Sequence, residues 1–296
     1  MRTGRTNLGI KGMNCWRDVA RFSVLAFTGL ALLSASAQTR KEFLYTVGPK
    51  AAVVVVNRFG PINVRPSSNN QVIATATLHS NKVEDDESHN GNRVELRSHV
   101  LQNATPQESQ IDFDPQVPVD AMVNVRTATG SVSAQGLQGD VVLVGDSGPV
   151  DARNMSNGYV HIKTLNGPIT LANISNGQLD VTSVGGDVNM NAVTGSHVSV
   201  NTASGKIVYV GDFGGEGDYS LSNHSGDIEV TIPQNASLDI TARSVTGSVE
   251  NDYPLAQKTH PSFAPTQGRS FAGTSNSASS SVQLRSFSGK IRLKKQ

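Results

Sequence analysis

Beyond residue 37 the chain alternates apolar and polar residues over short stretches that end at glycines. Val160 and Ile162 fall on one side of their stretch, and Ile169 and Leu171 fall on one side of the next. A period of two residues is typical of a β-strand with one buried side and one solvent-facing side. The i, i+3, i+4 apolar spacing of an amphipathic helix does not persist anywhere after residue 37. The pattern therefore predicts an all-β protein.

The glycines recur at a nearly fixed interval. In the main series the separations are 18, 19, 19, 19, 21, 21 and 42 residues: Gly130, Gly148, Gly167, Gly186, Gly205, Gly226, Gly247 and Gly289. A second series falls half a period earlier: Gly139, Gly158, Gly177, Gly195 and Gly217. Each repeat of about nineteen residues, here called a rung, is thus expected to hold two strands and two glycine corners. Corners such as Asn157-Gly158 suit the positive φ of a tight turn.

Two architectures fit this pattern. One is a parallel β-solenoid, in which equivalent residues of successive rungs form ladders; the other is an antiparallel meander or barrel. The two corners of a rung differ, because the main-series glycine is often followed by Ser, Pro, Asp or Lys and then Val or Ile. A hairpin array would repeat at the half period with similar corners, so the sequence favours the solenoid.

The first 37 residues have the three parts of a secretory signal. Arg17 and Arg21 precede an apolar run at residues 22–33, and Ala35-Ser-Ala37 forms the cleavage site. The run has twelve residues, which is shorter than the ~17–25 that a membrane anchor needs. We expect cleavage after Ala37 and no transmembrane span in the mature chain. Met13 is an alternative start to Met1.

The regular period covers only part of the mature chain. Residues 123–250 are expected to form the repeats, under an N-terminal cap of longer strands at residues 38–122. His79 to Asn92 is expected to be a polar loop in this cap. Residues 251–281, rich in Ser and Pro, are expected to form an insertion loop where one rung is missing, and residues 282–296 the final rung. We expect Lys290, Arg292, Lys294 and Lys295 to stop molecules from stacking end to end.

Composition excludes several functions. Lys plus Arg total 25 and Asp plus Glu 24, so the chain lacks the excess of positive charge that nucleic-acid binding requires. Cys15, the one cysteine, precedes the apolar run and is removed with the signal. The mature chain therefore has no disulfide and no cysteine zinc site. There is no G-x-S-x-G elbow, P-loop or HExxH motif, and we predict no catalytic, cofactor-binding or metal-binding residues.

Asp140, Asp187 and Asp227 each follow a corner glycine, and glycoside cleavage needs carboxylates gathered in one groove. Other rungs carry Pro or Lys at that position, so we expect these aspartates to bond turn amides instead. His161, His197 and His224 lie at different offsets from their corner glycines and are not expected to align.

Two segments resemble cation sites weakly. Gly214-Gly-Glu-Gly-Asp218 is similar to the calcium repeat of secreted β-rolls, but it occurs once and its Asp is misplaced, which favours a structural turn. The acidic run at residues 84–87, flanked by His79 and His89, lacks defined ligand spacing and is expected to be solvated.

The stretch from residue 117 to residue 141, with its stacked G-x-Val/Ile strand motifs, resembles the bacterial putative-adhesin domain family of otherwise unknown function. The resemblance covers roughly residues 50–296 and implies a β-solenoid at the cell envelope, with no catalytic residues to transfer.

We therefore expect a non-enzymatic envelope or secreted binding protein, in the periplasm, at the cell surface or outside the cell. Its outward Thr, Ser and Asn ladders would contact an envelope polysaccharide or a surface protein. A carbohydrate-active β-helix enzyme, either a polysaccharide lyase or a glycosidase, is the alternative, and a purely structural or regulatory envelope domain is a third possibility.

Overall fold

The computed structural model describes residues 38–258 and 266–296, and all regular elements in these residues are β-strands. The prediction of an all-β protein is confirmed. None of these residues belongs to a helix that could cross a membrane. The expected signal sequence, residues 1–37, lies outside the described residues.

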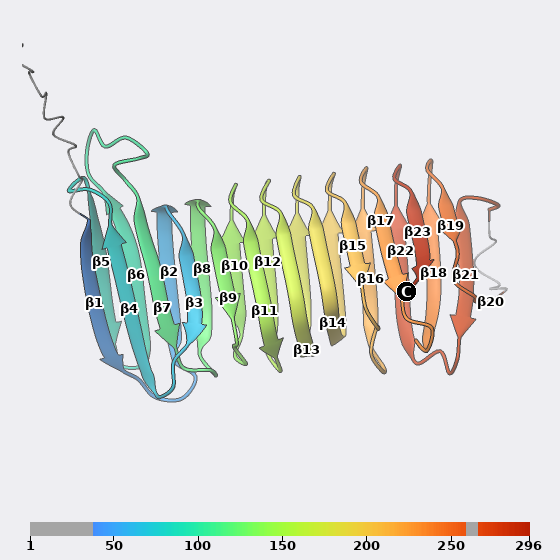
Figure 1. The fold of residues 1–296 in the computed structure, drawn as a ribbon, viewed down its shortest axis with the longest axis horizontal. Helices are drawn as coiled ribbons and strands as arrows, with labels where there is room; N and C mark the ends of the chain where they lie inside the picture. The colour runs from blue at the N-terminus through green and yellow to red at the C-terminus, as the bar shows by residue number, and fades with distance from the viewer. Residues whose placement is uncertain (1–37, 259–265) are drawn as a thin grey trace, which may run out of the picture. The chain divides into compact units, whose positions relative to one another are not determined.

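The strands join into one mixed sheet that runs along two rows (Figure 1). Row A contains, in spatial order, β1 (Thr39–Thr46), β4 (Gln71–Leu78), β7 (Ile111–Val117), β3 (Ile62–Pro66), β9 (Val132–Gln135), β11 (Val150–Ser156), the first halves of β13 (Ile169–Ser183) and β14 (Val188–Thr202), β15 (Ile207–Val210), β17 (Ile228–Ile232), β23 (Ile291–Lys295) and β19 (Val249–Asn251). Row B contains β5 (Val83–Asn90), β6 (Arg93–Val100), β2 (Ala52–Phe59), β8 (Met122–Thr129), β10 (Val141–Gly145), β12 (Tyr159–Thr164), the second halves of β13 and β14, β16 (Asp218–Asn223), β22 (Ser280–Ser286), β18 (Leu238–Ser244), β21 (Ser270–Ser275) and β20 (Ala256–Gln257).

Residues one period apart pair directly across parallel strands. Val160 of β12 pairs with Val141 of β10 on one side and with Leu179 of β13 on the other. Among the described strands, antiparallel pairs occur only near the two ends, in β1–β4–β7, β5–β6 and β18–β21–β20. Each repeat therefore contributes one strand to each row.

The two rows enclose one core. Alternate residues of each strand point inward, as Val160 and Ile162 do, and the inward residues of both rows form a single apolar cluster. A fully buried aliphatic side chain contributes about 1.5–3 kcal/mol, so every rung adds to the same continuous core.

The corner glycines are required by close stacking of the backbone. A Cβ atom on Gly148 would lie 1.8 Å from the carbonyl oxygen of Gly130, and one on Gly186 would lie 1.9 Å from that of Gly167. The expected positive φ is instead found at Asn157, where φ is 65°. At Asn157-Gly158 the asparagine thus adopts the predicted turn conformation, and the glycine lets successive rungs approach.

In five of the eight main-series corners, a buried hydroxyl three residues before the glycine holds the corner closed. The Ser183 hydroxyl accepts the Gly186 amide at 3.0 Å and donates to the Gly186 carbonyl at 2.9 Å. The same amide-to-hydroxyl bond recurs in four other corners, Thr164/Gly167, Thr202/Gly205, Ser244/Gly247 and Ser286/Gly289. Because the hydroxyl is buried, it supplies a bond that water cannot.

The N-terminal region differs from the expected cap in two respects. Residues 52–66 form a rung of their own, since β2 pairs in parallel with β8 and β3 with β9. The expected loop at residues 79–92 is wrong, because β5 lies within it and pairs antiparallel with β6. β5 is the edge strand of row B and is mostly exposed, so a polar sequence is compatible with a strand there.

The C-terminal rung is inserted between earlier rungs. β22 lies between β16 and β18, and β23 lies between β17 and β19, so the red strands in Figure 1 stand before the end of the stack. Residues 251–281 are not simply a loop, because β20 and β21 extend row B beyond β18. The expectation that the β23 cations guard the end of the stack is therefore wrong.

Candidate binding surfaces

The three candidate aspartates are used within the fold. Asp187 Oδ1 accepts the backbone amide of Lys206, and Asp227 Oδ1 accepts that of Lys290, each at 2.8 Å. Asp140 Oδ1 accepts the amide of Tyr159 at 2.9 Å. The first two lie at the corners that lead into row A, whereas Asp140 lies at the corners that lead into row B. The expectation that all three share one position is wrong for Asp140, but the expected bonds to backbone amides are present.

The three histidines do not align, as predicted. His161 of β12 pairs in register with Asp180, whereas His197 pairs with Gln178 and Asp218. Their Nδ1 atoms lie 3.2 Å from Asp180 and 3.6 Å from Asp218, respectively. His224 instead stacks on Phe287, with ring centroids 4.8 Å apart.

The acidic run and its flanking histidines are separated. His79 Nε2 lies 2.9 Å from Asp112 Oδ2, and His89 Nε2 lies 2.9 Å from the Gly91 carbonyl. Asp85 forms an ion pair with Lys41. Within residues 38–258 and 266–296, no group of three or more His, Cys, Asp or Glu side chains could hold a metal ion.

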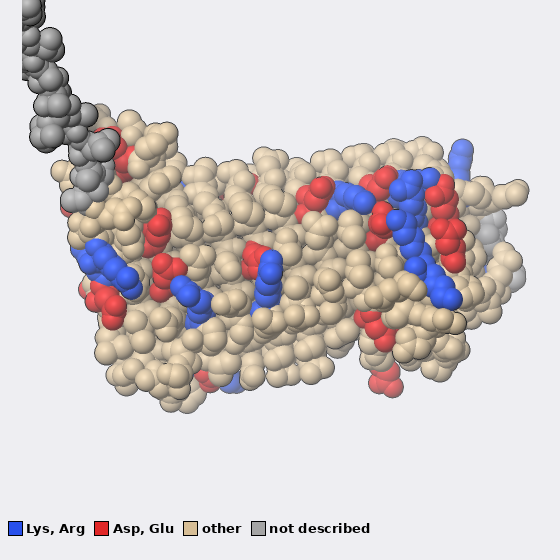
Figure 2. All heavy atoms as spheres, viewed as in Figure 1, with Lys and Arg blue, Asp and Glu red and all other residues tan. Residues whose placement is uncertain are grey.

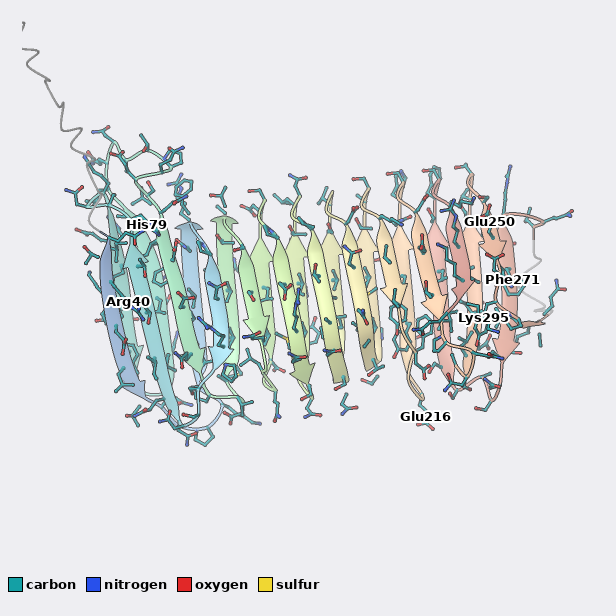
Figure 3. All side chains as sticks on the ribbon, in the orientation of Figure 1. Arg40, His79, Glu216, Glu250, Phe271 and Lys295 are labelled. Atoms are coloured by element: carbon teal, nitrogen blue, oxygen red, sulfur yellow. The ribbon has the colours of Figure 1, made fainter. Side chains whose placement is uncertain are left out.

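The Gly214–Asp218 segment forms an exposed turn. Glu216 has a φ of 64° and stands at the tip of this corner, away from the strands (Figure 3). Asp218 begins β16, where its carboxylate lies 3.6 Å from His197. Glu216 stands at the corner tip whereas Asp218 lies beside His197, so the segment has no calcium-like arrangement.

Cations of β23 meet carboxylates on both neighbouring strands. Lys294 Nζ lies 2.6 Å from Glu229 of β17, and Arg292 Nε lies 3.3 Å from Glu250 of β19. Figure 2 shows the resulting blue column with red on either side at the right-hand end. The hydrogen bond from Lys294, together with that from Lys206, lowers the pKa of Glu229. These ion pairs join β23 to both of its neighbouring strands.

An exposed apolar column runs along one corner of the stack. Backbone bonds align its positions, for example from the Gly185 amide to the Leu165 carbonyl and from Thr246 to Phe287. In spatial order the column contains Leu165, Val184, Ala203, His224, Phe287 and Val245. Its four large aliphatic or phenyl side chains are 43–49% exposed. Contiguous exposed apolar surface of this kind marks interaction sites.

A groove lies on the outer face of row B, over β6, β2, β8 and β10. Its volume is about 560 Å³, and its lining includes Val54, Val56, Asn124, Arg97 and Arg126. Arg97 and Arg126 are the partners of Val56 in the two neighbouring strands, so their side chains stand on opposite sides of it. The groove therefore has an apolar floor, and its lining carries three arginines and two carboxylates, Glu95 and Asp140.

Sequence reasoning missed both of these surfaces. Five of the six column positions are the second residue of a Ser/Thr-x-x-Gly pattern, which the sequence shows at six of the eight main-series glycines. The groove had a weaker signal, namely four consecutive valines at residues 53–56, where a strand with one solvent-facing side should alternate.

A family model described as Toastrack DUF4097 matches residues 54–294. No curated protein matches the chain. Among solved structures, a putative cell adhesion protein from Clostridium sporogenes is 13% identical, with 87% of this chain and 100% of that chain covered and a TM-score of 0.26. A putative adhesin from Bacteroides fragilis is 10% identical, with 88% and 99% covered and a TM-score of 0.46.

Proposed function

The chain belongs to the Toastrack DUF4097 family, and from that premise we propose that it is an exported, non-enzymatic, adhesin-like binding protein. In this proposal the repeats form a parallel β-solenoid that presents stacked side-chain ladders to an envelope polysaccharide or a surface protein. The parallel one-period register supports the solenoid. Residues 1–37 direct export, and cleavage after Ala37 places the mature protein in the periplasm, at the cell surface or outside the cell.

The exposed corner column is the observation that carries the proposal. Neighbouring strands lie about 4.8 Å apart, so the column presents one side chain per rung at that interval, and His224 is its one polar member. Hydroxyls flank it: Ser204 Oγ donates to the Val184 carbonyl and Thr246 Oγ1 to the Phe287 carbonyl. Repeated weak contacts with a polymer add through effective concentration, so a ladder of regularly spaced sites suits a polymeric ligand.

The aspartates that an enzyme would use support the same conclusion. Asp187 and Asp227 each hold a backbone amide of the next rung, and Lys206 separates their positions. A carboxylate that accepts a structural bond is poorly placed to act as an acid or a nucleophile on a sugar. We therefore place binding ahead of polysaccharide cleavage.

A glycan array probed with the purified mature protein tests this function. We expect saturable binding to at least one polysaccharide, weakened about tenfold or more by combined Leu165→Ser, Val184→Ser and Phe287→Ser substitutions. Leu44→Ser is the matched control, because Leu44 is 61% exposed on β1 outside the column. If the column variant and the control bind equally well, the column does not take part in polysaccharide binding. Polysaccharide cleavage that disappears in Asp187→Ala or Asp227→Ala would establish the enzyme instead.

A further inference from the structure

We propose that the groove over β6, β2, β8 and β10 binds an extended peptide segment in which an aliphatic side chain stands next to a carboxylate. The inference rests on the proposed binding function but uses a different surface from the corner column. Its volume of about 560 Å³ falls within the range of ligand sites, about 300–1,000 Å³.

The floor of the groove is apolar and suits an aliphatic side chain of the ligand. Val54 and Val56 of β2 and Val142 of β10 point outward and are half-buried, where the outer face of a strand normally carries polar residues. β6 and β8, on either side of β2, carry longer side chains, so β2 forms the bottom of a channel parallel to the strands. None of the lining residues is aromatic, whereas sugar rings bind best against aromatic faces.

One arginine of the groove is available for an anion. Glu95 accepts a hydrogen bond from Arg97 at 2.6 Å and lies 3.7 Å from Arg93, and the bond from Arg97 lowers the pKa of Glu95. Arg126, across Val56 from Arg97, forms no ion pair with any described residue. Its guanidinium therefore offers a bidentate partner to a carboxylate that lies along the channel.

Asn124 supplies the polar contact. It lies between Val54 and Val142 on the same face of the sheet, and its Oδ1 is buried with no hydrogen-bond partner in the described residues. A buried acceptor without a partner costs free energy unless a ligand or water supplies a donor. A peptide N–H directed at Asn124, with its aliphatic side chain on the valines and its carboxylate at Arg126, satisfies all three groups together.

Fluorescence anisotropy with a labelled Gly-Val-Glu-Val-Glu-Gly peptide tests the proposal on the mature protein. We expect saturable binding that weakens with salt, and no binding of the peptide with lysine in place of glutamate. Arg126→Gln should weaken binding about tenfold or more. Arg153→Gln is the control, because it removes an equal charge from row A, where Arg153 pairs with Asp151.

The Asn124→Val variant tests whether a loss of peptide binding is independent of a loss of stability. It removes the unpartnered oxygen, so we expect the urea midpoint to stay or rise while peptide binding weakens. Unchanged peptide binding in Arg126→Gln and Asn124→Val would overturn the inference. Binding of anionic phospholipid vesicles that needs Arg126, without peptide binding, would also overturn it and assign the groove to lipid.

The two proposals fail separately. The column variant with Leu165→Ser, Val184→Ser and Phe287→Ser should bind the peptide as the unmodified protein does, because the column and the groove share no residue. A protein that binds the glycan array but not the peptide contradicts the groove alone. A protein that binds the peptide but no array glycan contradicts the proposed polysaccharide ligand alone.

Discussion

At the corner glycines, the addition of one methyl group decides whether two rungs can stack. A Cβ atom on Gly186 would lie 1.9 Å from the Gly167 carbonyl oxygen, and the backbone next to both glycines is hydrogen-bonded to neighbouring rungs. We expect Gly186→Ala to lower the free energy of unfolding by about 3 kcal/mol or more, because neither rung can shift alone. Urea denaturation followed by circular dichroism measures the change.

Gly215→Ala is the matched control for this substitution. No atom lies within 4 Å of a Cβ at that position, and its φ is not positive. We expect a change of no more than about 0.5 kcal/mol. Similar losses at both positions would mean that flexibility of the unfolded chain, and not close stacking, determines the cost of replacing glycine.

The glycine period was readable from the sequence, but the reason for it was not. Asn157-Gly158 matched a turn dipeptide, and the turn does use a positive φ at Asn157. The close approach of Gly158 to Gly139 involves residues nineteen positions apart, and only the stacked structure reveals it. The buried hydroxyl of Ser183 was likewise assigned no role, because alternation alone does not distinguish a capping hydroxyl from a surface one.

Among the elements, β23 depends most on charge. Its outward residues are cationic. A carboxylate oxygen of Glu229 in β17 lies 3.2 Å from Lys206 Nζ, and the other lies 2.6 Å from Lys294 Nζ. The hydrogen bonds from these two lysines hold the pKa of Glu229 below its ordinary value of 4.5. A carboxyl group with a lowered folded-state pKa binds protons more weakly in the folded state than in the unfolded state.

The stabilisation by Glu229 should therefore depend on pH in one direction. It is fully present above pH 4.5, the ordinary pKa, and is lost as the pH falls through the lowered folded-state pKa. We expect Glu229→Gln to reduce stability at pH 7 by about 1 kcal/mol or less and to have no effect once the carboxyl is protonated. Urea midpoints of both proteins at pH 7 and pH 2.5 provide the comparison. A constant difference at both pH values would contradict the ionic role.

Polar edge elements were the hardest to predict. β5 lies where the sequence predicts a loop, because residues 84–90 lack apolar alternation. β20 is the edge strand at the other end of row B, and it lies in a Ser/Pro-rich segment that also lacks apolar alternation. An edge strand pairs on one side and can face water on both surfaces, so its hydrogen bonds leave little trace in hydrophobic periodicity. The interior strands, such as β12, bury alternate residues and were therefore predictable.

In the whole molecule, the order of strands in space departs from their order in the chain. The 42-residue gap between Gly247 and Gly289 indicated an insertion, and β20 and β21 lie within it. It carried no signal that β22 and β23 return between earlier strands, because parallel ladders of similar residues are compatible with either neighbour. Charge was the available clue: residues 253–296 contain seven lysines and arginines and no acid, so β23 fits between strands that carry glutamates.

This interleaving predicts an unusual response to truncation. In a stack built in chain order, removal of the last rung exposes only the rung before it. Here, a chain that ends at residue 281 loses most of β22 and all of β23, so β18 and β19 no longer have the strands that join them to β16 and β17. We expect backbone amides of residues 238–251 to exchange with deuterium about tenfold faster or more, while those of β10 and β12 stay protected.

Hydrogen–deuterium exchange with mass spectrometry distinguishes the two arrangements peptide by peptide. The protected β10 and β12 peptides are the internal control, because several rungs separate them from the deletion and each rung interacts mainly with its neighbours. If residues 238–251 keep their protection in the truncated chain, β18 and β19 have paired directly with β16 and β17. That result would mean that the C-terminal rung is added to a complete stack, and that the charges of β23 do not determine its place.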